Sequence, residues 1–309
     1  MYYFIINPSS QTGNGKVLWN KLKAAIHQEG IPYKAFFTSR QHTGSYLAEK
    51  ICDKDLGVKT IVVVGGDGTL NEVINGIPDF NHVILGYIPT GSGNDFSRGV
   101  GISRDPLKAL HAILHPKSFH MIDCGTMQMG NEKSRRFLIS SGMGYDASIC
   151  HKALTSPLKT ILNRFRLGKL TYILLAIKQL IKTAPFDASI EINGEKNIHR
   201  KQVLFLAAMN ERFEGGGLLM APNASDRDGL LSVCIVSGLS KTRVLFLMPL
   251  IFFGKHTLIK GVEIIPCRSM RVHASSIQYI HTDGEVPGAS DCLLYTIDKQ
   301  IVRILKSED

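Results

Sequence analysis

Residues 60–72 read TIVVVGGDGTLNE, and this segment decides the fold. Its first part, Thr60 to Val64, is apolar and rich in β-branched residues, which predicts a buried central strand. The next part, Gly65 to Thr69, places three glycines around Asp67, and helical sequence follows. Backbone N–H groups approach an anion closely at glycines, and a helix N-terminus adds a favourable dipole. We therefore predict a strand, a phosphate-binding turn and a helix, in preference to a plain tight turn.

The sequence around this segment alternates between strand and helix patterns. Such alternation predicts a parallel sheet with helices on both faces. The expected strands are Tyr2 to Ile6, Tyr33 to Thr38, Thr60 to Val64 and Val83 to Ile88, and the expected helices are Val17 to Glu29, Gly44 to Lys54, one beginning within Asn71 to Asn75, and Pro106 to Leu114.

After His120 the pattern changes to short strands separated by turns, which predicts a β-sandwich. The expected strands are Arg136 to Ser140, Asp187 to Ile192, Gln202 to Met209, Leu230 to Ser237, Arg271 to Ala274, Gln278 to Thr282 and Leu293 to Leu305. One long helical stretch, Ser156 to Thr183, is interrupted near Gly168. We expect an α/β domain over residues 1–121 and a β-sandwich domain over 122–309, with residues 294–309 packing back on the first domain.

The composition indicates a globular protein with anionic partners. Of 309 residues, 44% are hydrophobic and 20% are charged, and 36 Lys and Arg against 26 Asp and Glu give a net charge of +10. Nucleotide phosphates, acidic lipids and nucleic acid all fit this charge. Nucleic acid is not expected, because no recognition motif is evident. The longest apolar run, Val244 to Gly254, is about half of the roughly 20 residues that a spanning helix needs.

The N-terminus and the cysteines favour a cytoplasmic protein. Residues from Met1 read as a strand, without the basic start and cleavage site of a signal peptide. No CxxC pair occurs, and we interpret all six cysteines as reduced core residues. They are Cys52, Cys124, Cys150, Cys234, Cys267 and Cys292.

Two further polar loops follow predicted strands of the parallel sheet. Gly91 to Phe96 reads GSGNDF after the fourth strand, and Asn7 to Ser10 reads NPSS after the first. Taken alone, the GSGNDF segment fits a simple polar turn equally well. With Gly65 to Thr69, these loops converge at the sheet edge where α/β proteins bind ligands. The spacing excludes the GxGxxG and Walker patterns, the GxSxG elbow of hydrolases and the HExxH zinc motif.

These segments resemble the family of diacylglycerol kinases, sphingosine kinases and bacterial lipid kinases over nearly the whole chain. The resemblance rests on Asn7-Pro8, Gly65 to Asn71, Gly91 to Phe96, Pro222 to Leu230 and Thr282 to Glu285. The order and spacing of these five segments are highly specific. The first loop departs from the family pattern, because its glycine comes later than in the usual Asn-Pro-Xaa-Ser-Gly.

The resemblance implies an ATP-dependent lipid kinase, with diacylglycerol as the preferred acceptor and phosphatidic acid as the product. It also implies that the first domain binds ATP, that the second receives the lipid, and that the ATP crevice lies between them. The implied ATP-binding residues are Asn7, Pro8, Ser9, Ser10, Gln11, Thr38, Gly66, Asp67, Gly68, Thr69, Leu70, Asn71, Glu72 and Ser92.

The resemblance assigns the chemistry to two carboxylates. Glu285 is the implied base for the lipid hydroxyl, although a hairpin with a solvated glutamate would be preferred without the resemblance. Asp67 is expected to position phosphates bound to Mg²⁺. A structural Mg²⁺ is implied at Asp228 and the carbonyls of Ser225 and Leu230, with Asp226 as an alternative ligand. Support for the substrate site is expected from Asn94, Asp95 and Asp283.

A basic apolar stretch between His151 and Ala184 contains seven Lys or Arg residues and no acid. Such a stretch suits an anionic membrane surface, and it fits a core helix with a solvated basic face equally well. Peripheral membrane association is therefore expected for a cytoplasmic enzyme. The sequence does not decide the oligomeric state, and a homodimer that pairs through an edge strand is one alternative.

Three other functions compete with a lipid kinase. NAD kinases share the Gly-Gly-Asp-Gly-Thr turn, but their Asn-Glu pair has only Asn210-Glu211 as a counterpart here. A non-catalytic lipid or nucleotide sensor is disfavoured because both Asp67 and Glu285 are present. The hypothesis of a nucleic-acid-binding protein is supported by the net charge alone.

Overall fold

The computed structural model describes residues 1–10, 13–54, 57–155 and 168–306, with side chains of helix α8 described from residue 175 onward. The chain forms two compact units. The first comprises residues 1–124 with 299–309, and the second comprises residues 125–298.

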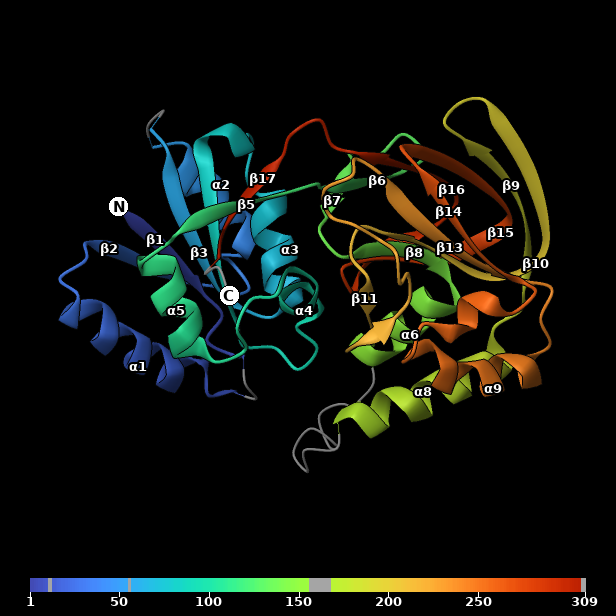
Figure 1. Cartoon of the computed structure of the whole chain (residues 1–309), viewed down its shortest axis with the longest axis horizontal. Coiled ribbons are helices and arrows are strands. Elements are labelled where there is room, and N and C mark those ends of the chain that lie inside the picture. Colours follow the sequence, from blue (N-terminus) through green and yellow to red (C-terminus); the bar gives the residue numbers. More distant parts are fainter. Residues whose placement is uncertain (11–12, 55–56, 156–167, 307–309) are drawn as a thin grey trace. The chain divides into compact units, whose positions relative to one another are not determined.

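The first unit is built on a six-stranded sheet in the order β2-β1-β3-β4-β17-β5. The strands are β1 (Tyr2–Ile6), β2 (Tyr33–Phe37), β3 (Lys59–Gly65), β4 (Val83–Pro89), β5 (Ser118–Ile122) and β17 (Val302–Lys306). Neighbouring strands are parallel, except that β5 is antiparallel to β17. The central strand β3 is apolar from Ile61 onward, and Ile61 to Val64 are completely buried. Figure 1 shows the helices on both faces of this sheet.

Two helices of the first unit, α2 (Gly44–Cys52) and α5 (Pro106–Leu114), begin after a side chain that caps them. Thr43 accepts a hydrogen bond from the N–H of Tyr46, and Asp105 accepts from two N–H groups before Pro106 sets the helical φ angle. The helices are α1 (Gly15–Gln28), α2 (Gly44–Cys52), α3 (Asp67–Asn75), α4 (Asp95–Val100) and α5 (Pro106–Leu114), with the 3₁₀ turn η2 (Phe80–His82). α2 packs on α3, and α5 packs on β4.

The second unit is built on a nine-stranded sheet in the order β14-β13-β10-β8-β15-β16-β6-β7, in which β9 pairs with both β10 and β15. The strands are β6 (Gly125–Met129), β7 (Arg135–Phe137), β8 (Ser140–Gly144), β9 (Phe186–Ile192), β10 (Lys196–Met209), β13 (Leu231–Ser237), β14 (Val262–Cys267), β15 (Ser269–Thr282) and β16 (Glu285–Ile297).

Irregularities in the two longest central strands bend this sheet around a core. The register of β10 with β9 shifts between Arg200 and Val203, where Gln202 has a φ of 52°. The register of β15 with β16 shifts between His273 and Gln278. Such bulges curve a strand and increase its twist. The enclosed core contains Phe137, Phe186, Tyr295 and the neighbouring aliphatic side chains.

Helices and a short hairpin complete the second unit. They are α6 (Tyr145–Thr155), α8 (Gly168–Lys182), α9 (Lys241–Ile251), η3 (Lys255–Leu258), β11 (Phe213–Glu214) and β12 (Leu218–Leu219). A second apolar cluster joins Tyr145, Leu180 and Val244 of these helices to Phe205 of β10. No helix in the described part of the chain is long and apolar enough to cross a membrane.

The predicted fold class is confirmed: a parallel α/β unit and a β-rich unit are present, and the C-terminal strand joins the first sheet. The predicted strand Leu293 to Leu305 is wrong, because β16 ends at Ile297 and β17 begins at Val302. Asp298 pairs with Arg136 and Gln300 accepts the N–H of Phe80, so the chain changes sheets between the two strands.

Other expectations need correction. Helices α4, α6 and α9 were not predicted. The predicted strand Arg136 to Ser140 is wrong, because β7 ends at Phe137 and β8 begins at Ser140. None of the six cysteines, which all lie in the described residues, forms a disulfide bond, but Cys52, Cys150 and Cys292 are only half-buried, so they are not all core residues. The first part of the predicted helix Ser156 to Thr183, as far as residue 167, lies outside the described residues. The rest forms α8, which ends at Lys182.

Candidate active site

The two glycine turns of the first unit lie against each other. β3 and β4 are parallel neighbours, so the turns that follow them leave the same sheet edge. A Cβ atom on Gly66 would lie 3.2 Å from Cα of Gly91, and one on Gly91 would lie 2.9 Å from Cα of Gly66. Only glycine at both positions permits this approach.

The Asp67 carboxylate connects these turns. Asp67 is the first residue of α3, and its Oδ2 accepts the backbone N–H of Asp95 at 3.0 Å. Its Oδ1 accepts the hydroxyl of Tyr87 on β4 at 3.2 Å. Two donors from the β4 side therefore fix the orientation of the carboxylate beside the N-terminal turn of α3.

Asn94 and Asp95 shape the second turn. Asn94 has a φ of 51°, and its side-chain amide accepts the N–H of Gly91 at 2.9 Å and donates to the carbonyl of Gly91 at 2.8 Å. Asp95 forms an ion pair with Arg98 at 2.7 Å. Both Asn94 and Asp95 are buried, so they hold the turn in shape, while Ser92 at its tip is exposed.

The loop after β1 is tied to the same edge. Nδ2 of Asn7 donates to Oγ1 of Thr69 at 3.0 Å, and Oδ1 of Asn7 accepts the N–H of Ser9 at 2.9 Å. A Cβ atom on Gly15 would lie 2.5 Å from the carbonyl oxygen of Asn7, so α1 begins directly against this loop. The predicted ligand Gln11 lies outside the described residues.

Other predicted ATP-binding residues have different surroundings. Thr38 follows β2, and its N–H donates to the carbonyl of Ile6 at 2.9 Å. Leu70 and Asn71 are buried. The Glu72 carboxylate accepts the N–H of Gly44 at 2.7 Å, which holds the start of α2. Their side chains thus contribute to packing and capping within the first unit.

The predicted base Glu285 lies in the second unit, on the β15–β16 hairpin. Thr282 pairs with Glu285 across a two-residue turn in which Asp283 and Gly284 have φ angles of 49° and 83°. The Asp283 carboxylate accepts three backbone N–H groups, from Leu138, Ile139 and Ser140, at 2.9 to 3.0 Å. Asp283 therefore anchors the turn, and Glu285 follows at the start of β16.

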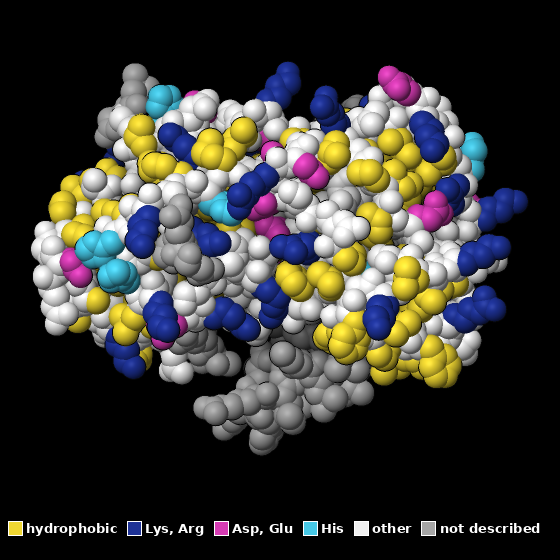
Figure 2. Space-filling view, viewed as in Figure 1, with side chains coloured by type: hydrophobic (Ala, Val, Ile, Leu, Met, Phe, Trp, Pro, Cys, Tyr) yellow, Lys and Arg dark blue, Asp and Glu magenta, His cyan; other side chains and the backbone are white. Residues whose placement is uncertain are grey.

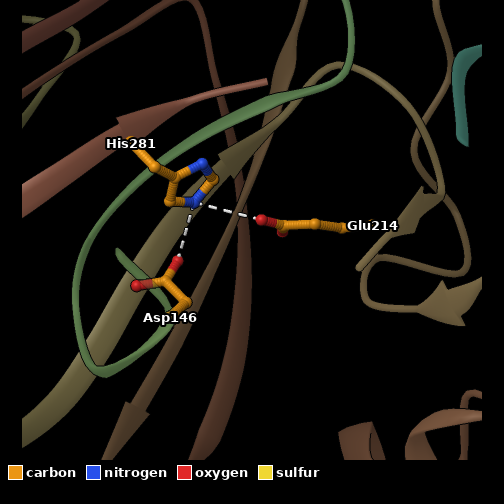
Figure 3. Close-up of side chains that lie close together, drawn as sticks. All are labelled: Asp146, Glu214 and His281. Carbon is orange, nitrogen blue, oxygen red and sulfur yellow. Dashed lines mark hydrogen bonds and ion pairs between the residues drawn. The ribbon is translucent and has the colours of Figure 1, made fainter. Parts of the chain in front are cut away.

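Beside this hairpin the structure assembles a cluster that the sequence did not reveal (Figure 3). Nε2 of His281 lies 3.0 Å from Oδ2 of Asp146 and 3.0 Å from Oε1 of Glu214. The side chains come from β15, the start of α6 and β11. A Cβ atom on Gly142 would lie 2.1 Å from Oδ2 of Asp146, so glycine leaves the space in which the cluster forms.

The environment of the cluster favours a charged imidazole. Burial alone would lower the pKa of His281, but the negative charges of Glu214 and Asp146 outweigh burial and raise the pKa well above its usual 6.5. Burial also raises the pKa of Asp146. The imidazolium then lies between two carboxylates in an interior from which His281 exposes no surface.

No sequence motif joins these three residues. They come from distant parts of the chain, and the hydrogen bond of His281 to Asp146 spans 135 positions. One signal in the sequence could have indicated His281. This residue directly precedes Thr282 to Glu285, the segment that resembles lipid kinases.

The predicted metal loop offers only oxygen ligands. Oδ1 of Asp228 accepts the N–H of Leu230 at 3.0 Å, and Oγ of Ser225 accepts the N–H of Arg227 at 3.3 Å. The Asp228 carboxylate is exposed, and two carbonyls accompany it in the predicted ligand set. Hard cations such as Mg²⁺ prefer this donor chemistry, so the residues fit the predicted ion.

A buried glutamate lies next to this loop. Burial, together with the charge of Asp226, raises the pKa of Glu211 to about 8. Asn210 is fully buried, and its Nδ2 donates to the carbonyl of Leu138 at 3.0 Å. The Asn210-Glu211 pair is therefore part of the packed interior of the second unit.

Two protein-family models match the chain. The diacylglycerol kinase catalytic domain matches residues 1–127, and the YegS C-terminal NAD kinase beta sandwich-like domain matches residues 142–306. The two matches follow each other without overlap and together span nearly the whole chain.

Individual relatives are similar over the same length. "Putative lipid kinase YtlR" of Bacillus subtilis is 29% identical over 296 residues, 94% of each chain. A diacylglycerol kinase of Mycobacterium tuberculosis is 27% identical over 284 residues, 91% of this chain and 87% of the other. A crystal structure described as a "putative diacylglycerol kinase" of Bacillus anthracis has a TM-score of 0.77 at 20% identity and covers 99% of this chain and 97% of the other. This structural likeness shows the shared fold.

Proposed function

Because the chain belongs to the family of kinases that join a diacylglycerol kinase catalytic domain to a YegS-type C-terminal domain, we propose that it transfers the γ-phosphoryl group of ATP to the hydroxyl of a membrane lipid. The proposed acceptor is diacylglycerol, and the product is phosphatidic acid. Relatives named diacylglycerol kinase support this choice of acceptor.

The observation that carries the proposal is the contact between Gly66 and Gly91 beside the oriented Asp67 carboxylate. Bare backbone and the first turn of α3 present N–H groups and a helix dipole to an anion, which suits the phosphates of ATP. When bound with ATP, Mg²⁺ neutralises charge on the phosphates, and Asp67 is the residue proposed to orient them.

We propose that Glu285 accepts the proton of the lipid hydroxyl. The carboxylate follows a turn whose backbone is fixed by three hydrogen bonds to Asp283, so Glu285 begins β16 at a defined position. A general base must accept the hydroxyl proton as the oxygen attacks the γ-phosphorus, and a carboxylate on a fixed backbone is suited to this role. The Asp228 loop is proposed to hold a structural Mg²⁺ that stabilises the second unit.

An NAD kinase-like reaction is the alternative function. The Asn210 amide is bonded inside the second unit, and Glu211 is 4% exposed. These side chains are occupied by packing, which favours a lipid acceptor over a dinucleotide.

A phosphoryl-transfer assay with labelled ATP tests the proposal. We expect label in diacylglycerol presented in detergent micelles, less in phosphatidylglycerol and sphingosine, and none in NAD. The Asp67→Ala variant serves as the blank, with a loss of about 100-fold or more, because the phosphates lose their orienting carboxylate. Transfer to NAD, or undiminished transfer by Asp67→Ala, would contradict the proposal.

The proposed enzyme works at an anionic membrane as a peripheral protein. A lipid acceptor with two acyl chains lies in a bilayer, and the net charge of +10 favours acidic headgroups. The seven cations predicted to contact the membrane include Lys159, Arg164 and Arg166, which lie outside the described residues.

A further inference from the structure

Helix α9 is apolar on two opposite faces. Val244 and Leu247 are buried against the second unit, as expected for the inner face of a surface helix. On the outer face, however, Leu245 is 41% exposed and Phe246 is 79% exposed. A helix on the surface of a globular protein normally has a polar outer face. Packing within the second unit therefore does not explain why the outward side chains of α9 are apolar.

The segments next to α9 extend this surface. Phe252, Phe253 and Leu258 follow the helix and are 57%, 72% and 81% exposed, and Ile181 at the end of α8 is 70% exposed. Nζ of Lys241 donates to the carbonyl of Ile181 at 2.5 Å, which holds the end of α8 next to the start of α9. We call this surface the α9 patch, and it consists of Ile181, Leu245, Phe246, Phe252, Phe253 and Leu258. Figure 2 shows hydrophobic side chains gathered over α8 and α9.

The α9 patch is accompanied by cations and by no acid in its own segment. The sequence from Leu239 to Val262 contains no Asp or Glu. The exposed cations of this segment and of the end of α8 are Lys182, Lys241, Arg243, Lys255 and Lys260. Large exposed apolar patches mark interaction sites, and this one would meet an anionic partner most favourably.

We propose that the α9 patch docks on the surface of a lipid bilayer that contains anionic lipids. Phenylalanine and leucine side chains would enter the boundary between headgroups and acyl chains, while lysine and arginine contact the acidic headgroups. The proposal rests on the proposed function, because a lipid kinase must meet its acceptor at a bilayer. It assigns membrane contact chiefly to residues 241–260, beyond the basic stretch predicted from the sequence.

The charge of the α9 patch favours a bilayer over a second copy of the chain. In a twofold dimer the same patch lies on both sides of the interface, so its cations would face one another. Juxtaposed like charges oppose association. Anionic headgroups would instead neutralise the same cations.

Vesicle flotation with the full-length protein tests this surface. The vesicles contain phosphatidylcholine alone or phosphatidylcholine with phosphatidylglycerol. Replacing both Phe246 and Phe253 with Ser should weaken binding to the anionic vesicles by about 100-fold, since each buried aromatic contributes about tenfold. Reversing Lys255 and Lys260 to Glu should weaken it at least about tenfold on anionic vesicles and leave binding to phosphatidylcholine unchanged.

Matched controls lie on another part of the second unit. Ile277→Ser removes a side chain that is 70% exposed, and Lys201→Glu reverses an exposed cation. Both controls should bind vesicles like the wild type. Unchanged binding by Phe246→Ser/Phe253→Ser would overturn the proposal. So would a wild-type dimer that fails to bind vesicles and becomes monomeric in this variant, since the partner would then be a second copy.

Fluorescence adds a direct measure of insertion. The sequence contains one tryptophan, Trp19, which is 5% exposed in the first unit and gives a constant background. A tryptophan introduced as Phe246→Trp should shift its emission to shorter wavelength on anionic vesicles, and Ile277→Trp should not. Equal spectra of Phe246→Trp with and without vesicles would contradict insertion.

The assays separate failure of this surface from failure of the proposed function. With a short-chain diacylglycerol that dissolves as a monomer, Phe246→Ser/Phe253→Ser should keep wild-type turnover, because the patch contributes no catalytic group. Vesicle binding that depends on the patch, without phosphorylation of any lipid, would refute the function and leave the docking surface standing. Lipid phosphorylation together with vesicle binding that does not depend on the patch would support the function and refute the docking surface.

Discussion

Glu285 begins β16 directly after the anchored Asp283–Gly284 turn, so its side chain can be neutralised without disturbing the turn. Glu285→Gln should lower kcat by about 100- to 10,000-fold, because the amide cannot accept the hydroxyl proton. The change is measured with diacylglycerol micelles and labelled ATP, and circular dichroism verifies the fold.

The matched control for this substitution is Glu195→Gln, at an exposed position in the β9–β10 turn. It should retain wild-type turnover. If Glu285→Gln also turned over at the wild-type rate, Glu285 would not be the base.

His281 contributes to stability because it is fully buried between two carboxylates that are themselves only slightly exposed. Replacing it with Asn leaves Asp146 and Glu214 without the cation between them, and breaking a buried ion pair in this way costs about 3–5 kcal/mol. Urea unfolding at neutral pH measures the loss. The triple variant with Asp146→Asn and Glu214→Gln added should be less destabilised than His281→Asn, because no unpaired charge remains.

The same residue predicts a pH dependence. The pKa of His281 is raised above its usual value of 6.5, so the folded protein holds this proton more tightly than the unfolded chain. Its contribution is complete below pH 6.5 and is lost as the pH rises through the folded-state pKa. The stability difference between wild type and His281→Asn should therefore shrink with rising pH. His273→Asn, at an exposed position of β15, should show no such trend, and a constant difference for His281→Asn would refute the charged imidazole.

At the scale of elements, the two glycine turns act as one unit. A Cβ atom on Gly91 would lie 2.8 Å from Oδ1 of Asn94 and 2.9 Å from Cα of Gly66, so Gly91→Ala must separate the turns. Displacement of a positioning group by about 1 Å costs about 100-fold in rate. We expect a loss of this size in kcat/KM for ATP. Gly288→Ala, whose Cβ would make an ordinary contact of 3.6 Å with Met129, should be active, and an equally active Gly91→Ala would exclude a phosphate role for the turns.

The elements also show what the sequence could predict. Strands β1 to β4 of the first unit were predicted because they are short, apolar and separated by amphipathic helices. β15 was predicted as two pieces because its middle, at the register shift, lacks strand alternation. Helix α9 was missed because apolar side chains on both faces remove the helical period, and Pro249 interrupts the pattern.

In the candidate site, too, the sequence predicts continuous segments but not contacts between distant residues. Its turns could be predicted because each one is continuous in sequence, as in Gly65 to Thr69. The cluster of Asp146, Glu214 and His281 could not, because it depends on pairing between strands and on the space left by Gly142. Likewise, the sequence does not indicate that Asn71 is buried and that Glu72 caps α2.

At the scale of the whole molecule, the chain ends in the unit in which it begins. β17 lies between β4 and β5, and Val302 and Ile304 are completely buried there. Every strand of the second unit, by contrast, comes from residues 125–298. The last strand therefore stabilises the first unit alone.

A chain that ends at Asp298 tests this arrangement. Without β17, the facing edges of β4 and β5 lose their hydrogen-bond partner and the apolar contacts of Val302 and Ile304, which the first unit cannot replace. We expect the truncated chain to lose ATP binding, and limited proteolysis with mass spectrometry should find cuts throughout residues 1–124 while fragments of 125–298 persist. The full chain with Ile301→Ser, an exposed change just before β17, should resist proteolysis like the wild type. Native-like protection of residues 1–124 in the truncated chain would show that β17 is dispensable.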